Sequence, residues 1–335
     1  MLPVAVDAMG GDRAPADVVE GARRAADAGI PVVLVGPPDL GERVDLGGLA
    51  VIPASEVIEM HADGAQAVRR KKDSTLVRAA EAVRDGVASA TISAGNTGAT
   101  MAAALLRMGR IKGVSRPAIA TQLPVPGSTP TILLDSGANA EVQPEWLVQF
   151  AHMGTVFARE RAGITSPRVG LLSIGEEPGK GDTLRKEAYR LLEAAPGLNF
   201  IGNVEGRDVL TPDVDVVVTD GFTGNVVLKA LEGSLRMMMH ALLTAFGSDP
   251  SYQEHADALM PALLPLYDEL NPDTYGGALL LGVDGVSIIS HGSSGATAMF
   301  NGIKVAAEMV ERGMVGQIRD AIAAGAAGAG ADISA

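Results

Sequence analysis

A glycine-rich loop with a single lysine occupies residues 174–183, which read IGEEPGKGDT. It follows an apolar run and precedes a segment with helical spacing, an arrangement in which backbone N–H groups and a helix N-terminus favour an anion. A nucleotide-binding P-loop has four residues between its glycines and Ser or Thr after its lysine. Here three residues separate Gly175 from Gly179, and a glycine follows Lys180. The sequence therefore predicts a small-anion site at Lys180, with a plain strand-to-helix turn as the alternative.

Five other apolar, strand-like runs also end in glycine beside Asp, Asn, Ser or His. One such turn would be ordinary loop chemistry, because Gly and Asn suit left-handed turns and Asp or Ser caps helices. Six turns of this kind, in a fold whose strand ends converge, predict one polar crevice. Including the lysine loop, the six segments are 7–12, 93–98, 135–139, 174–183, 220–225 and 290–294.

Runs of Val, Ile and Leu alternate with helical patterns along most of the chain. Strands of this kind between helices are typical of a parallel sheet that is buried on both faces. The pattern predicts an α/β protein, a doubly wound α/β/α sandwich that binds ligands beyond the carboxyl ends of its strands. We expect one large domain over residues 1–335, with an irregular edge at 36–56, a helical excursion at about 248–275 and a flexible tail at about 323–335.

The excursion contains the apolar stretch LMPALLPLY at residues 259–267. Pro261 and Pro265 predict a short or kinked helix there. The stretch either packs on its own domain or on a dimer partner, or it forms a protruding tip that touches a membrane surface or an acyl chain.

Composition excludes several classes of function. The formal net charge of −13 argues against nucleic acid and against simple electrostatic adhesion to an anionic membrane. The absence of cysteine excludes disulfides, thiolate metal sites and a cysteine nucleophile. No apolar run has transmembrane length and no signal sequence precedes the first strand-like run, so we expect a cytoplasmic protein, with peripheral membrane contact as an option. An acidic partner would need a local basic patch, such as RRKK at residues 69–72 or the looser cluster of Arg107, Arg110, Lys112 and Arg116.

Long motifs then match a known family in order along the chain. The stretches VDAMGGDRAP, RRKKDST, SAGNTGAT, DSGANAEVQPEWLVQFAHMG, GLLSIGEEPGKGDTLRKEAYRLL, VVVTDGFTGNVVLK and YGGALLLGVDGVSIISHGSS resemble those of the bacterial phosphate acyltransferases of phospholipid synthesis, the PlsX family. The likeness runs from about Val4 to Ala307 and is looser at 36–56 and 231–272. Leu279 and Gly295 depart from the proline and asparagine usual in the family, which affects loop detail alone.

The resemblance implies a reaction in which acyl-[acyl carrier protein] and inorganic phosphate give acyl phosphate and free carrier. It also implies a homodimer, no organic cofactor, and a fold similar to the isocitrate and isopropylmalate dehydrogenases. The product would feed a membrane-bound glycerol-3-phosphate acyltransferase. On this reading the anion is phosphate or the phosphopantetheine phosphate of the carrier. The alternatives are a phosphotransacetylase acting on acyl-CoA, a decarboxylating dehydrogenase, and a non-catalytic module that binds the carrier or lipid.

Direct attack of phosphate on a thioester requires cations and N–H groups that hold the phosphate close to the carbonyl carbon. It also requires preorganised donors for the oxyanion. A thiolate leaves readily, since its pKa is about 8.5, so a strong general acid is not needed. The chain has no G-x-S-x-G elbow of a serine hydrolase.

Cations and neutral donors at the strand ends are therefore the predicted catalytic groups. Lys180 would hold phosphate, and Asn96 would bind phosphate or the oxyanion. His291 would donate a hydrogen bond to the oxyanion or the leaving sulfur, unless it is a structural turn residue. Asn225 and Lys229, four residues apart on one helical face, could both reach the crevice.

The surrounding groups are predicted to bind or orient the substrates. The three strand-end aspartates would orient donors or cap helices, and we expect no metal because no two of them share a close motif. The two lysines of the RRKK run would face the acidic carrier protein. The stretch LRMMMHALL, together with the tip, would line an acyl groove, unless these methionines are core. The full set comprises Asp7, Gly10, Gly11, Lys71, Lys72, Ser93, Thr97, Gly98, Asp135, Asn139, Gly179, Gly181, Asp220 and Ser293.

Overall fold

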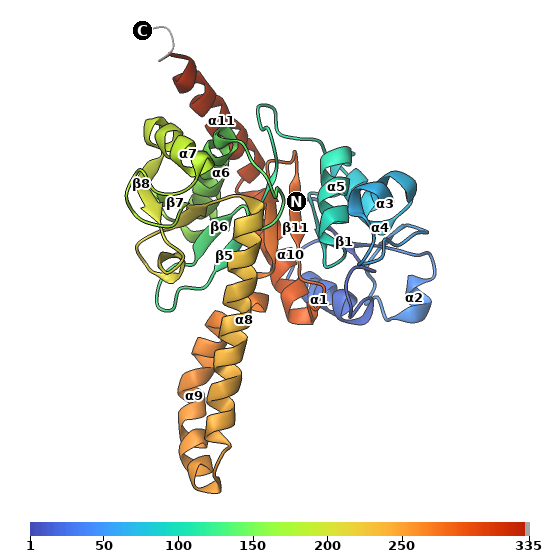
Figure 1. Ribbon diagram of the computed structural model, residues 1–335. Coiled ribbons are helices and arrows are strands. Elements are labelled where there is room, and N and C mark those ends of the chain that lie inside the picture. The colour runs from blue at the N-terminus through green and yellow to red at the C-terminus, as the bar shows by residue number, and fades with distance from the viewer. Residues whose placement is uncertain (332–335) are drawn as a thin grey trace.

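A computed structural model describes residues 1–331, with side chains as far as residue 326. Its centre is a single large sheet with helices packed on both faces, and a long helical hairpin projects from this body (Figure 1). The predicted α/β/α sandwich is therefore confirmed. Along the sheet the strand order is β3-β2-β1-β4-β11-β10-β5-β6-β9-β7-β8.

The strands are short and mostly buried. Their bounds are β1 (Val4–Asp7), β2 (Val32–Gly36), β3 (Val51–Pro53), β4 (Ala90–Ser93), β5 (Ala118–Leu123), β6 (Thr131–Leu134), β7 (Arg168–Leu172), β8 (Asn199–Val204), β9 (Val216–Val218), β10 (Ala278–Leu281) and β11 (Val286–Ile289).

The sheet is not wholly parallel, so this part of the prediction was wrong. Strand β10 pairs antiparallel with both β11 and β5, and β5 pairs antiparallel with β6. All other pairings between named strands are parallel. Strands β1 to β4 and β11 therefore run in one direction, while β6 to β9 run in the other. The carboxyl ends of the two halves lie at opposite edges of the sheet.

Helices cover the sheet in two layers. The α-helices are α1 (Ala16–Asp27), α2 (Leu40–Arg43), α3 (Gly64–Arg70), α4 (Thr75–Arg84), α5 (Thr97–Arg107), α6 (Pro144–Ala162), α7 (Thr183–Ala194), α8 (Gly221–Phe246), α9 (Gln253–Leu270), α10 (Ala296–Glu311) and α11 (Met314–Ala331).

Strand alternation assigns the helices to the two faces. On β6, Ile132 and Leu134 join one continuous core with α1, α6, α7, α10 and α11. Leu133 points to the other face, where it joins a separate cluster under the start of α8. Helices α4 and α5 cover the same face over the other half of the sheet. On this second face, central strand β5 therefore lies between α5 and α8.

The projecting hairpin consists of α8 and α9, and it extends well below the body in Figure 1. The excursion begins within α8, earlier than the predicted residue 248. Helix α9 runs through Pro261 and Pro265 over 18 residues, so it is longer than expected. The hairpin turns between Phe246 and Gln253, so the stretch 259–267 lies along α9 and not, as predicted, at the protruding tip. Of the residues in α9 only Ala256 is buried, so most of α9 stands clear of the sandwich.

Two peripheral segments are more regular than predicted. The segment at 36–56 contains α2 and the edge strand β3, which pairs parallel with β2. The expected tail from residue 323 is helical as far as Ala331, because α11 continues to that residue. The remainder of that tail, 332–335, lies outside the described residues.

The first turn of α8 packs directly on the end of β6, and this contact requires a glycine. A Cβ atom at Gly224 would lie 1.9 Å from the carbonyl oxygen of Asp135. We expect Gly224→Ala to lower the free energy of unfolding by about 3 kcal/mol through overpacking. Gly233 lies on the same helix, and a Cβ atom added there would have nothing within 4 Å. Gly233→Ala should therefore stabilise the protein by up to about 1 kcal/mol. Equal urea midpoints for the two variants would contradict this packing.

Candidate active site

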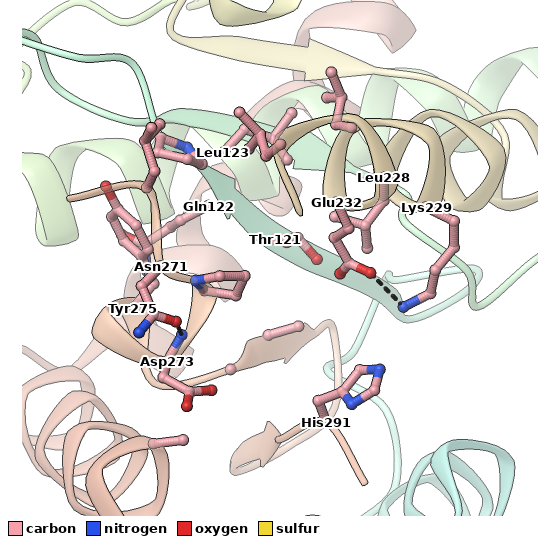
Figure 2. A pocket seen from close by; sticks show the side chains of 18 of the residues that line it. Thr121, Gln122, Leu123, Leu228, Lys229, Glu232, Asn271, Asp273, Tyr275 and His291 are labelled. Carbon is pink, nitrogen blue, oxygen red and sulfur yellow. Dashed lines mark hydrogen bonds and ion pairs between the residues drawn. The ribbon is translucent and has the colours of Figure 1, made fainter. Parts of the chain in front are cut away.

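A cavity of about 600 Å³ lies over β5, between α5 and α8. Figure 2 shows side chains that line it, among them Thr121 on β5 and His291 after β11. Because the cavity sits over the central strands, loops from both oppositely directed halves of the sheet reach it. The polar residues at one end are Thr97, Ser136, Asn225, Lys229, His291 and Ser293.

The predicted convergence of strand ends is therefore found for four of the six segments. The loops after β4, β6 and β11 and the first turns of α8 all contribute lining residues. The segment after β1 does not line the cavity, and neither does the lysine loop after β7.

A row of apolar residues extends from the polar end along α8, beside the polar lining residues Glu232, Arg236 and His240 of the same helix. Its residues recur every three or four positions and so form one stripe, which is about 22 Å long at a rise of 1.5 Å per residue. Met237 and Met238 lie off this stripe and are 64% and 56% exposed. The stretch LRMMMHALL therefore contributes only part of its side chains to the cavity, and its role in an acyl groove stays a prediction. The stripe comprises Leu228, Leu231, Leu235, Met239 and Leu243.

His291 presents a defined hydrogen-bond donor to the cavity. Its Nδ1 accepts the backbone N–H of Ser293 at 3.3 Å and lies 2.8 Å from the Ser293 hydroxyl. Because Nδ1 accepts a backbone N–H, the neutral ring carries its proton on Nε2. The Nε2–H is therefore available to an oxyanion or a leaving sulfur.

Asn225 and Lys229 lie in the first turns of α8, on the face that lines the cavity. The Asn225 amide makes no hydrogen bond to any described residue, so its donors are available to a ligand. Lys229 Nζ lies 2.9 Å from Glu232 Oε2, the ion pair drawn dashed in Figure 2. An anion that binds Lys229 must compete with this carboxylate.

Asp220 fixes the start of α8, and its role is structural. Its carboxylate accepts the Thr223 backbone N–H and hydroxyl, both at 2.8 Å, and it pairs with Arg185. Burial disfavours the charged carboxylate, but these donors outweigh burial and lower the pKa of Asp220. The capping alternative is therefore the one that the structure supports for Asp220.

Asp7 and Asp135 also organise loops. Asp135 is fully buried and accepts the backbone N–H groups of residues 119, 137, 138 and 139 as well as the Asn139 side-chain amide. Asp7 accepts the Ser93 hydroxyl at 2.7 Å, and burial raises the pKa of its carboxyl. A Cβ at Gly10 would lie 2.6 Å from Asp7 Oδ2, so Gly10 permits this packing. None of these groups lines the cavity.

The Asn96 side chain is occupied by the protein itself, in contrast to the catalytic role predicted for it. Its Oδ1 caps α5 by accepting the Ala99 N–H at 2.9 Å. Its Nδ2 lies 2.8 Å from the carbonyl oxygens of both Met60 and Ala62. Neither side of the amide is left for a ligand, so we assign Asn96 a structural role. Its neighbour Thr97 does line the cavity.

Lys71 is likewise bound internally and is not free to face a partner. Its Nζ lies 2.6 Å from the carbonyl oxygen of Val57 and 2.8 Å from Glu59 Oε1. Lys72 is exposed and forms no ion pair with a described residue. The two lysines of this run therefore have different environments.

Lys180 lies outside the cavity lining. Its side chain is 49% exposed, and its only ion pair with a described residue is a 3.8 Å contact with Glu177. The flanking Gly181 has a positive φ of 92°, as a glycine turn allows. Arg185 links the loop to the cavity, because its guanidinium pairs with Asp182 and with Asp220 at the start of α8. The lysine loop thus adjoins the polar end without entering it.

Sequence reasoning missed several lining residues. Ser290 is buried, and its hydroxyl has no hydrogen-bond partner among the described residues. The Thr121 and Ser136 hydroxyls lie 2.6 Å apart. Ser136 and Ser290 lie in the glycine-rich segments 135–139 and 290–294, so the sequence could have indicated both. Glu232 could have been found only from its i, i+3 relation to Lys229.

Two features are absent from the described part of the chain. No cluster of three or more His, Cys, Asp or Glu is arranged to hold a metal ion there. None of the helices there has the length and apolarity needed to cross a bilayer.

A family model described as "Fatty acid synthesis protein" matches residues 2–317. The chain belongs to this family. Among curated relatives, the phosphate acyltransferase of Desulfitobacterium hafniense strain Y51 is 49% identical over 327 residues, covering 95% of this chain and 97% of the relative. That of Pelotomaculum thermopropionicum is 49% identical over 328 residues, covering 96% and 95%. As a member of this family the protein is an acyltransferase of lipid synthesis.

Solved structures with low sequence identity show the same fold. A branched-chain phosphotransacylase from Enterococcus faecalis V583 has a TM-score of 0.61 at 15% identity, with 92% of this chain and 99% of that chain covered. A 4-hydroxythreonine-4-phosphate dehydrogenase from Klebsiella pneumoniae has a TM-score of 0.55 at 14% identity, with 92% and 100% covered. The fold is thus shared with a phosphotransacylase and a dehydrogenase.

Proposed function

We propose that the protein transfers a long-chain acyl group from acyl-[acyl carrier protein] to inorganic phosphate, giving acyl phosphate and free carrier. The observation that carries this proposal is the two-part cavity. One end offers a cation and neutral donors, and apolar residues of α8 form a wall about 22 Å long that also carries Glu232, Arg236 and His240. A short-chain transacetylase has no use for such a wall.

The polar end suits direct attack by phosphate. A phosphate oxygen forms the new C–O bond at the thioester carbon, the C–S bond breaks, and the thiolate departs with the bonding electrons. Lys229 positions the phosphate, while the Asn225 amide and His291 Nε2–H stabilise the oxyanion. No covalent enzyme intermediate is required, in keeping with a chain that lacks cysteine.

We assign Lys180 as a second cation for phosphate, together with the N–H groups of Gly179 and Gly181. Its weak ion pair leaves the side chain able to move, and Arg185 holds its loop beside α8. The phosphate would then lie between Lys229 on α8 and the lysine loop.

The Lys229–Glu232 pair leads to a testable effect on phosphate binding. Glu232→Gln removes the competing charge, so we expect the KM for phosphate to fall about 2- to 5-fold, as for a partly exposed pair worth up to about 1 kcal/mol. Lys229→Met should raise the same KM. Steady-state kinetics with varied phosphate measure both changes. A higher KM in Glu232→Gln would show that the carboxylate assists phosphate binding.

The hairpin supports two further parts of the proposal. We propose that α8 pairs with that of a second copy in a homodimer, because Met237 and Met238 are both more than half exposed. The apolar stretch at 259–267 would contact a membrane surface, where a glycerol-3-phosphate acyltransferase would consume the product.

Phosphate-dependent release of carrier thiol tests the reaction. Purified protein is incubated with palmitoyl-[acyl carrier protein], with and without phosphate, and free thiol is measured. We expect release only with phosphate, and much slower release from acetyl-CoA. Equal rates with acetyl-CoA would favour the phosphotransacetylase alternative. Carrier binding without any release would favour a non-catalytic module.

A further inference from the structure

Three exposed cations lie at the end of α3. Arg69, Arg70 and Lys72 are exposed, and none forms an ion pair with a described residue. Lys71, in the middle of the same run, is turned inward to Glu59 and Val57. A cluster of free cations on a chain of net charge −13 is a local positive surface on an acidic protein.

This cationic surface is linked by hydrogen bonds to the polar end of the cavity. Lys71 Nζ donates hydrogen bonds to the carboxylate of Glu59, the first residue of the 59–62 segment. The Asn96 side-chain amide donates hydrogen bonds to the carbonyl oxygens of Met60 and Ala62 in the same segment. Asn96 in turn caps α5, whose first residue, Thr97, lines the cavity. Hydrogen bonds therefore connect the basic run, through Lys71 and the 59–62 segment, to the start of α5 at the polar end.

Met60 supplies an exposed apolar group at the same place. It is 45% exposed. A Cβ at Gly292 would lie 2.8 Å from Met60 Cε, so Met60 packs against the residue after His291. Free cations, an exposed methionine and His291 therefore follow one another across the surface. Arg and Met are both enriched in protein interfaces.

We propose that Arg69, Arg70, Lys72 and Met60 form the docking surface for the acidic acyl carrier protein, with Lys71 and Asn96 as the residues that hold it in place. The inference rests on the proposed function and names the surface that its carrier contacts. An acidic partner is repelled by most of this protein and attracted to this patch, which lies beside the donors for its thioester. Because hydrogen bonds already hold the 59–62 segment in place, docking does not carry the entropy cost of ordering it.

The test is a triple charge reversal, Arg69→Glu, Arg70→Glu and Lys72→Glu. Its matched control is Lys112→Glu, Lys186→Glu and Lys304→Glu, which changes the net charge equally at exposed cations that form no ion pair with described residues. Calorimetry measures the Kd for holo-acyl carrier protein, and kinetics compare palmitoyl-[acyl carrier protein] with palmitoyl-N-acetylcysteamine. For the patch variant we expect Kd and KM for the carrier to rise 10- to 100-fold, with kcat/KM for the small thioester unchanged within twofold. The control triple should bind carrier within about threefold of wild type.

Three results would overturn the inference. One is an equal loss of carrier binding in both triples, which would be a net-charge effect. Another is an equal loss of activity with both thioesters, which would place the patch in the chemistry. The third is unchanged carrier binding with loss of binding to phosphatidylglycerol vesicles, which would assign the patch to lipid. If wild type binds carrier through the patch but forms no acyl phosphate from either thioester, the proposed function fails and the docking surface stands.

Discussion

Asn225→Ala is expected to lower kcat about 100- to 1,000-fold, the cost of removing one preorganised oxyanion donor. Asn225 lies at the polar end of the cavity, and its amide is not used by any described residue. It is held there by α8, whose start is fixed by the Asp220 cap and by Gly224 packed on the end of β6. The loss should appear in kcat more than in KM for the acyl carrier, because the donor acts mainly on the charge that develops during attack.

Two further variants make this result specific. Asn225→Asp keeps the shape but replaces donors with a negative charge, so it should be at least as inactive as Asn225→Ala. Thr244→Ala, on an exposed position of the same helix, should retain wild-type turnover. An Asn225→Ala enzyme within a few-fold of wild type would remove Asn225 from the mechanism and leave His291 as the main oxyanion donor.

Lys180→Ala is expected to lower kcat/KM for phosphate by about 100-fold, since a hydrogen bond to a charged group contributes up to about 3 kcal/mol. The structure places Lys180 beside the cavity and not in its lining, so this variant also tests whether the loop brings its cation to the phosphate. The effect should fall on phosphate more than on the acyl carrier. Steady-state kinetics with each substrate varied in turn separate the two.

Lys186→Ala is the matched control for this variant, because Lys186 is an exposed lysine in the next helix with no ion pair to a described residue. It should behave as wild type, and Lys180→Arg should recover part of the activity. Near-normal kinetics for Lys180→Ala, with the same unfolding midpoint as wild type, would mean that Lys229 binds phosphate without the lysine loop.

The layers of the fold were predictable from the sequence, but the direction of its central strands was not. Runs such as TILL at 131–134 and ALLL at 278–281 are buried on both faces, and such runs have the same composition whether their neighbours are parallel or antiparallel. The reversal matters for the site. Because of it, the loops from the two halves of the sheet meet over the face of β5 and not at one edge of the sheet.

Residue types at the site were predicted better than their partners. Asn96 and Lys71 were recognised as available donors, yet both are used to hold a segment around residues 57–62. Asn96 lies 34 to 36 positions away from its carbonyl partners, and no local pattern predicts so distant a bond. His291, Asn225 and Lys229 did reach the cavity. The apolar stripe of α8 became visible only once the helix was seen to pass the cavity.

The most direct test of the central claim is to trap the product. The protein is incubated with palmitoyl-[acyl carrier protein] and hydroxylamine, with and without phosphate, and palmitoyl hydroxamate is quantified. Hydroxylamine itself cleaves the thioester slowly, so an enzyme-free control is subtracted. We expect enzyme-dependent hydroxamate only with phosphate, in amounts equal to the enzyme-dependent thiol release, and we expect it to fall with Asn225→Ala. Thiol release at the same rate without phosphate, with free palmitate as the product, would show a thioesterase and contradict the central claim.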